Sequence, residues 1–586
     1  MIRYRYRWSA VLLVLIASIT TPMLAADSPG WSHATALPHE AYVAVEISQP
    51  DRVLQQLFEP RVKQAVTSHP EFVRQRNQPD FLQMMNLVEY FERRFETDLQ
   101  GLLQKLLGGG ITLGIGPGEQ VLVILEAEDE KVLSEVHDFL LMIARNQEQG
   151  QNDSVRSAEY RGVTGWSFGP GQTHAILGNR LLWTNQPQAL TAAIDRIQQA
   201  DLPNLASLPS YQQSRKSSAK RPVASVFARM DVLKELPPVA AALDQQNNPL
   251  LTLLLAPLMQ AWKQSDWLAL DLDLEDLTLT MTVTSDGRAD DGALPTGFAK
   301  STEAADGAMP NLNVPRQIAG ISFYRDLHRF YAAKDDLFPQ RTSGLIFFEN
   351  MMGIFFTGRD LTEEVLAELH PEVRMVIAQQ EYPAEIGTPD PQLPGVALVF
   401  RMKRPDQFSL VAEEAWQKAL GLINFTRGQQ AEPGLILDKP THAGVKYTLA
   451  AFLPPEKSDR APAETRFNFQ PALAMLDGFL VLSSTDALAR DLIDALQQET
   501  KEGVVPEAGN HSIAQLNGSS LASIVRANRE TLIRQNMVEK GHSREQAEAE
   551  IGMLAAVVGS IGRLQIAAGG DRAEQLTIEL ELDLQP

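Results

Sequence analysis

Alternating apolar and polar positions recur over much of the chain and predict antiparallel strands. Residues 268–274 and 277–283 alternate at every second position, which predicts a hairpin around Glu275-Asp276. Residues 563–567 and 576–584 predict another hairpin near the end of the sequence. Because successive side chains of a strand point to opposite faces, these segments indicate sheets with one buried and one solvated face.

Other segments space their apolar residues three and four apart, as amphipathic helices do. Residues 79–107 and 529–558 each predict a pair of such helices. Antiparallel hairpins with helices packed on one face define the α+β class. We therefore predict an α+β fold.

Two stretches far apart in the chain resemble each other. Residues 175–197 align without a gap with residues 474–496, at an offset of 299 positions (474 minus 175). Both predict a strand, a tight turn, a second strand, a polar cap and an amphipathic helix. The turns, Gly178-Asn179 and Asp477-Gly478, contain residues that tolerate positive φ, and Thr184 and Ser483 with their polar neighbours are the predicted helix N-caps.

Further segments follow in the same order on both sides of the middle of the chain. Residues 121–128 resemble 396–403, each followed by a predicted helix, and residues 225–230 resemble 523–527. A stretch rich in Gly, Ala, Asp and Pro, residues 287–316, lies between them and predicts a flexible linker. We therefore expect two tandem similar α+β halves, residues 38–286 and 317–586.

The N-terminal segment has the three parts of a secretory signal peptide. Arg3, Arg5 and Arg7 precede the apolar run 10–19, and small residues for cleavage follow at Ala25 and Ala26. Residues 1–25 are therefore the predicted signal peptide. Bulky side chains stand three positions before either cleavage point, so an uncleaved N-terminal anchor remains an alternative. No later stretch is long and apolar enough to predict a membrane span.

Composition narrows the chemistry that the exported part can perform. The chain has no cysteine, which excludes disulfides, thiolate metal sites and cysteine nucleophiles. Its net charge of −21 becomes −24 without the three arginines of residues 1–25, and such a surface repels nucleic acid. The one basic cluster, Arg215, Lys216, Lys220 and Arg221, lies in a Ser/Pro-rich stretch that predicts a solvated loop.

One motif matches a catalytic pattern. Residues 165–169 (GWSFG) fit the G-x-S-x-G nucleophile elbow, with Ser167 as the nucleophile. That motif needs a strand that turns sharply into a helix, and here Pro170-Gly171 leads to another predicted strand. The sequence therefore favours a strand that ends in a turn, and Ser167 remains the weak catalytic candidate.

No cofactor or metal site is predicted. The glycine runs 108–110 and 114–118 lack the residues of a dinucleotide or phosphate loop and predict a helix end and a hairpin turn. The acids Asp271, Asp273, Glu275 and Asp276 alternate with leucine, which favours the wet face of a strand over a cation site. No two of the ten histidines have the spacing by which one element holds a metal ion.

A family resemblance rests on residues 37–45 (LPHEAYVAV). This stretch is similar to the L-P-x-[DE] opening of a group of exported bacterial proteins classed only as domains of unknown function. The resemblance implies an exported α+β protein with recurring strand–helix units and implies no catalytic residues. His39 departs from the aspartate or small residue expected at its position.

These observations together favour an exported, non-enzymatic binding or structural protein of the bacterial cell envelope, located in the periplasm or outside the cell. Its ligand or protein partner is unknown, and neither nucleic acid nor a second membrane span is expected. Two alternatives stay open. One is a serine-type hydrolase that uses Ser167, and the other is a carrier of lipids or other hydrophobic molecules, which predicts an apolar cavity between sheet and helices.

Overall fold

The chain divides into two compact units in a computed structural model. The first unit contains the described residues up to Ala240 together with Ser265–Asp286, and the second contains Ala241–Gln264 together with the described part of Gly287–Asp583. The predicted signal peptide lies outside the described residues. The structure describes residues 33–68, 72, 76, 78–147, 155–167, 171–199, 201–217, 221–243, 249–287, 298, 305–338, 342–454, 463–569 and 575–582.

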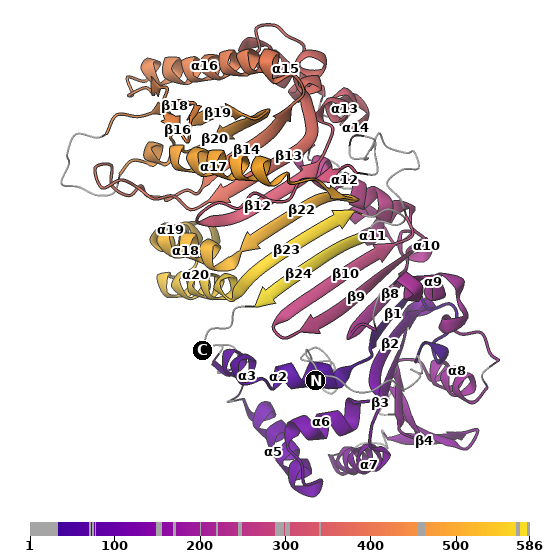
Figure 1. The fold of residues 1–586 in the computed structure, drawn as a ribbon. Helices are drawn as coiled ribbons and strands as arrows, with labels where there is room; N and C mark the ends of the chain where they lie inside the picture. Colours follow the sequence, from indigo (N-terminus) through magenta and orange to yellow (C-terminus); the bar gives the residue numbers. More distant parts are fainter. Residues whose placement is uncertain are drawn as a thin grey trace. The chain divides into compact units, whose positions relative to one another are not determined.

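The first unit is built on an antiparallel sheet (Figure 1). Its strands run in the order β4-β5-β6-β7-β3-β2-β1-β8-β9-β10, and all of these pairings are antiparallel. The strands are β1 (Val43–Ile47), β2 (Gly110–Gly116), β3 (Gln120–Glu126), β4 (Arg156–Tyr160), β5 (Val163–Ser167), β6 (Thr173–Leu177), β7 (Arg180–Thr184), β8 (Ala224–Arg229), β9 (Trp267–Glu275) and β10 (Thr278–Ser285).

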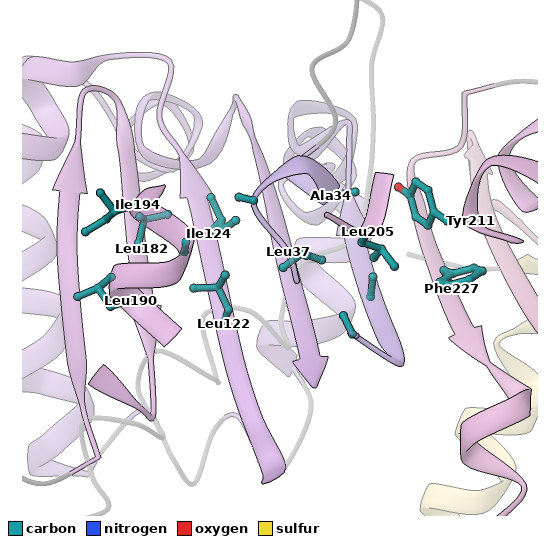
Figure 2. Packing of buried hydrophobic residues seen from close by; sticks show 14 of the residues in the cluster. Ala34, Leu37, Leu122, Ile124, Leu182, Leu190, Ile194, Leu205, Tyr211 and Phe227 are labelled. Carbon is teal, nitrogen blue, oxygen red and sulfur yellow. The ribbon is translucent and has the colours of Figure 1, made fainter. Parts of the chain in front are cut away.

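Helices fill the connections of the first unit, and two of them cover opposite faces of the β6–β7 hairpin. Leu190 and Ile194 of α8 pack on Leu182, Leu122 and other residues of the main core (Figure 2). Helix α7 lies against the other face, where its His137 contacts His174 of β6. The helices are α2 (Pro50–Leu57), α3 (Pro60–Ser68), α5 (Pro79–Arg94), α6 (Leu99–Leu107), α7 (Glu130–Gln147), α8 (Pro187–Gln198), α9 (Pro209–Ser217), α10 (Met230–Leu233) and α11 (Pro237–Leu243), the last of which straddles the unit boundary.

The second unit is also built on antiparallel strands. Its main strands run in the order β15-β18-β19-β20-β14-β13-β12-β22-β23-β24, again antiparallel throughout. These strands are β12 (Gln317–Tyr324), β13 (Leu369–Ala378), β14 (Gly395–Met402), β15 (Ile436–Asp438), β18 (Thr448–Ala451), β19 (Ala472–Leu476), β20 (Phe479–Ser483), β22 (Asn510–Asn517), β23 (Ile561–Gly569) and β24 (Gln575–Leu582), with the short pairs β11 (Gly307–Ala308)–β21 (Glu507–Ala508) and β16 (Thr441–His442)–β17 (Val445–Lys446).

Helices α16 and α17 cover opposite faces of the β19–β20 hairpin. Leu492 of α17 packs with Val481, whereas Ala412 of α16 packs with Leu473 and Leu480 on the other side. The helices of this unit are α12 (Pro249–Gln264), α13 (Leu327–Ala332), α14 (Lys334–Leu337), α15 (Thr342–Phe355), α16 (Pro405–Gln429), α17 (Asp486–Glu502), α18 (Gly518–Ala527), α19 (Arg529–Lys540) and α20 (Arg544–Gly559). No helix among the residues described in either unit is long and apolar enough to span a membrane.

The α+β class is confirmed, and the same strand order occurs in both units. Each main strand of the first unit has a counterpart at the same place in the strand order of the second, from β4 and β15 at the start of the order to β10 and β24 at its end. Strands β7 and β20 begin 299 positions apart, and so do helices α8 and α17, as the aligned sequences predict. The predicted hairpins β9–β10 and β23–β24 and the helical pairs α5–α6 and α19–α20 are also present.

The helix N-caps lie among the polar neighbours of Thr184 and Ser483, and the similarity predicted for residues 523–527 was wrong. Thr184 and Ser483 are the last residues of their strands, so the N-caps fall two positions later, at Gln186 and Thr485. The hydroxyls of Thr184 and Ser483 instead accept hydrogen bonds from the backbone N–H groups of these two later residues. Residues 523–527 belong to helix α18, and the strand that corresponds to β8 is β22, which lies just before that helix.

The predicted linker, residues 287–316, is in part ordered. Residues 307 and 308 form β11, and Ala308, Met309, Leu312 and Val314 are buried in the second unit. Helix α12 also belongs to that unit, because Ala256 packs with Phe298, Leu337 and Phe338, although the preceding and following strands belong to the first unit. Periodicity along the sequence cannot reveal which sheet an inserted helix will join.

Candidate functional site

Ser167 ends strand β5 within an antiparallel hairpin. It pairs with Thr173 of β6, and its neighbour Trp166 pairs with His174. A strand therefore follows the motif where a nucleophile elbow requires a helix. Because side chains alternate along a strand, Ser167 points to the α8 face, whereas Trp166 and His174 share the α7 face. The structure does not bring the Ser167 hydroxyl and this histidine together.

The basic cluster is not a solvated loop throughout. Arg215 lies in α9, and its guanidinium donates a hydrogen bond to the Glu46 carboxylate at 2.8 Å and stacks over the Tyr211 ring. A second contact joins Arg215 to Asp271 at 3.9 Å, so one of the acids on β9 faces a cation of its own unit. Lys216 is exposed, as predicted for the cluster, and Lys220 lies outside the described residues.

A buried histidine anchors the start of the described chain. His33 contacts the Thr112 hydroxyl through Nδ1 at 2.8 Å and the Glu126 carboxylate through Nε2 at 2.6 Å. Arg180 also donates to Glu126 at 3.2 Å. Burial raises the pKa of Glu126, but the bonds from His33 and Arg180 outweigh it and lower that pKa to about 2. This network fastens residues 33–37 to β2 and β3.

The side chains with the most unusual environment are His137 of α7 and His174 of β6. Their Nε2 atoms face each other at 3.0 Å, and both residues are buried, with 9% and 5% of their surface exposed. Trp166 of β5 closes the group, edge-on to His137 and stacked on His174, with ring centroids 4.7 and 5.8 Å away. We call these three side chains the histidine pair site.

Burial keeps both imidazoles neutral at neutral pH. It lowers the pKa of His137, although the neighbouring Asp138 carboxylate acts in the opposite direction. Burial and the proximity of His137 lower the pKa of His174 to about 4. The Asp138 carboxylate lies 3.6 Å from Nδ1 of His137. It favours a proton on that nitrogen, which leaves the Nε2 lone pair directed at His174.

The second unit fills the corresponding positions with apolar side chains. The strands β3 and β14 and the helices α7 and α16 begin 275 positions apart, so His137 corresponds to Ala412. The hairpin offset of 299 places His174 opposite Leu473. Ala412 and Leu473 belong to one apolar cluster. The second unit therefore has an alanine and a leucine at the positions where the first unit buries two imidazoles.

The second unit carries a different feature, exposed large apolar side chains on α15 and α16. These two helices are in mutual contact (Figure 1). Helix α15 has one charged residue, Glu349, which pairs with Lys334. Its Phe347 is 70% exposed, and on α16 Leu410 is 72% exposed. We call the following set the apolar helix surface: Ile346, Phe347 and Ile354 of α15, and Leu410, Leu422 and Phe425 of α16.

Within the described part of the chain, no three His, Asp or Glu side chains converge on one point. The sequence analysis missed the histidine pair site because its histidines lie on a helix and a strand that are distant in sequence. One signal was available. The 299-position alignment sets His174 against Leu473, which marks a polar residue at a position that the fold uses for its core.

The comparisons with known proteins find similarity to one protein family of unknown function. Residues 8–291 match a family model described as a protein of unknown function (DUF3352). This match confirms the coarser part of the predicted resemblance, which is a likeness to a domain of unknown function. No curated protein matches the chain.

Solved structures of TP0453 in crystal forms I, IV and III match with TM-scores of 0.23, 0.24 and 0.24, each at 9% identity. They cover 45%, 43% and 46% of this chain and 82%, 79% and 84% of theirs. TM-scores in this range do not establish a shared fold.

Proposed function

We propose that this protein is an exported, non-enzymatic binding component of the bacterial cell envelope, and that its second unit binds lipid bilayers through the apolar helix surface. One observation carries the proposal: large apolar side chains of α15 and α16 face solvent. Four of them, Phe347, Ile354, Leu410 and Phe425, are each at least 64% exposed. Apolar clusters of this kind mark interaction sites on soluble domains.

The character of the two helices favours a bilayer as the partner. The apolar helix surface combines phenylalanine, isoleucine and leucine, and its α15 part holds no unpaired charge that would resist transfer out of water. A membrane interface accepts such side chains without a complementary protein surface. In the first unit, helix α7 occupies the place of α16, and its exposed large apolar side chain is Met142.

The alternatives receive less support. A carrier needs an apolar cavity, whereas the space between α17 and its sheet is filled by Leu488, Leu492, Ile493 and their neighbours. A hydrolase that uses Ser167 needs a base beside the hydroxyl, and the nearby imidazole of His174 lies on the other face of the sheet. The matching strand orders support a tandem duplication.

Vesicle flotation tests the bilayer proposal. We expect the purified protein to float with phosphatidylethanolamine vesicles and the double variant Phe347→Ser, Ile354→Ser to lose about tenfold or more in partitioning, since burying each side chain contributes about 1.5–3 kcal/mol. The matched control, Leu82→Ser with Met142→Ser, removes two exposed apolar side chains of the first unit and should float like the wild type. Equal loss in both variants, or no flotation of the wild type, would rule out the assignment.

Cell fractionation with N-terminal sequencing tests the export proposal. We expect the protein in the periplasmic or extracellular fraction with a new N-terminus at Ala26 or Asp27. A membrane-bound form that retains Arg3, Arg5 and Arg7 would establish the anchor alternative instead. A cytoplasmic protein with an intact N-terminus would contradict export.

A further inference from the structure

We infer that the histidine pair site binds a divalent transition-metal ion of the copper, nickel or zinc class between Nε2 of His137 and Nε2 of His174. The inference is independent of membrane binding and concerns the first unit alone. It rests on the separation of the two nitrogens, on the hydrogen-bonding capacity of the pair, and on the comparison with the second unit.

The separation of the nitrogens fits two ligands of one ion. Imidazole nitrogens bind these metals at about 2.0–2.1 Å, so two of them lie about 2.9 Å apart at right angles and about 3.3–3.4 Å apart in a tetrahedron. The observed separation of 3.0 Å lies within that span. The separation is therefore compatible with both nitrogens binding one ion, as it is with a direct N–H···N hydrogen bond.

The protonation preferences of the pair also suit a metal ion. A direct hydrogen bond between two neutral imidazoles requires one Nε2 to carry a proton. The Asp138 carboxylate favours the tautomer of His137 with its proton on Nδ1, as carboxylates do for histidines that bind metals. One lone pair, on Nε2 of His137, is then directed at Nε2 of His174.

The comparison between the units argues against a purely structural role. The same fold places Ala412 and Leu473 at these positions, so it does not require two buried imidazoles there. A polar pair that the fold does not require points to a ligand. Imidazole donors select copper, nickel or zinc over calcium and magnesium, which prefer oxygen. Two protein nitrogens leave coordination positions for water or for a donor from a bound partner.

Trp166 provides the readout, because its indole touches both imidazoles. Titration of the purified protein with copper(II) chloride should quench part of its tryptophan fluorescence and saturate at one ion per chain. Electron paramagnetic resonance of the copper-loaded wild type should show coupling to two imidazole nitrogens. This second measurement needs no variant, so it tests the site even where a substitution impairs folding.

The variants take their residues from the second unit. His137→Ala and His174→Leu reproduce Ala412 and Leu473, and each should weaken copper binding by about 100-fold. His442→Ala removes a partly exposed histidine that pairs with Asp494, and it should bind like the wild type. Unchanged binding in the double variant, an absence of two-nitrogen coupling, or no saturable quenching would overturn the inference and leave a structural N–H···N bond.

Discussion

At the residue scale, the second unit contains a guanidinium buried among backbone carbonyls. Arg325 is fully buried, and Pro257 lies inside α12, where it cannot donate to the Leu253 carbonyl four residues earlier. Nε of Arg325 donates to that carbonyl at 2.7 Å, and another of its nitrogens donates to the Leu254 carbonyl at 2.9 Å. The arginine thus replaces the hydrogen bond that the proline removes.

Replacing Arg325 should therefore destabilise the second unit. We expect Arg325→Met to lower its free energy of unfolding by about 3–5 kcal/mol, because several buried acceptors lose their donor at once. Urea denaturation followed by tryptophan fluorescence measures the change. Arg329→Met, which removes an exposed arginine paired with Asp326, should cost no more than about 1 kcal/mol. Similar losses in the two variants would show that the carbonyl contacts contribute little.

Glu126 gives the first unit a defined pH dependence. Its pKa in the folded protein, about 2, lies below its usual value of 4.5. The stabilisation is therefore complete above about pH 4.5 and is lost as the pH falls toward about 2, because the unfolded chain then binds the proton more readily. We expect Glu126→Gln to lose about 2–3 kcal/mol at neutral pH and to approach the wild type near pH 3. Urea titrations at both pH values test this, and a difference that does not change with pH would contradict it.

At the element scale, the N-terminus of α17 depends on one hydroxyl. Thr485 accepts a hydrogen bond from the backbone N–H of Leu488, one of the donors that a helix start leaves unpaired. We expect Thr485→Ala to cost about 1 kcal/mol more than Thr485→Ser, since both remove the methyl group and only serine keeps the cap. Thermal unfolding by circular dichroism compares the two variants. Equal stability would mean that the hydroxyl does not cap the helix.

The elements that sequence patterns predicted are those with local causes. The β19–β20 hairpin follows from its own turn, where Asp477 and Gly478 both adopt the positive φ that a tight hairpin requires. The N-caps lie two positions after Thr184 and Ser483 because pairing with β3 and β14 carries the strands through these two residues. Pairing between distant strands is decided by packing that leaves no mark in a short window of sequence.

The candidate sites were harder to predict for the same reason. His137 and His174 lie on different elements, and they meet only after α7 and β6 pack together. The exposed side chains of α15 were hidden as well, because an apolar stretch of sequence predicts a buried helix as readily as an exposed one. What the sequence did contain was the alignment of the two halves, which, extended by one residue, sets His174 against Leu473 of the common core.

At the scale of the whole molecule, each unit carries its own core at matching positions. Ile194 of α8 and Ile493 of α17 lie 299 positions apart, and both are almost fully buried. The hydrophobic cluster around each isoleucine consists of residues of the same unit. A domain with a separate core can unfold as a separate cooperative step. We therefore expect the two units to unfold in separate steps.

Matched substitutions in the two cores make that consequence measurable. We expect two transitions in scanning calorimetry, with Ile194→Ala lowering the stability of one and Ile493→Ala that of the other, each by about 2–5 kcal/mol. The double variant should show both losses, since distant sites with no shared partners are additive. If each substitution displaced both transitions together, the units would fold as one cooperative block. Separate transitions would mean that one unit can change its surface, as at Phe347 of α15, while the stability of the other is preserved.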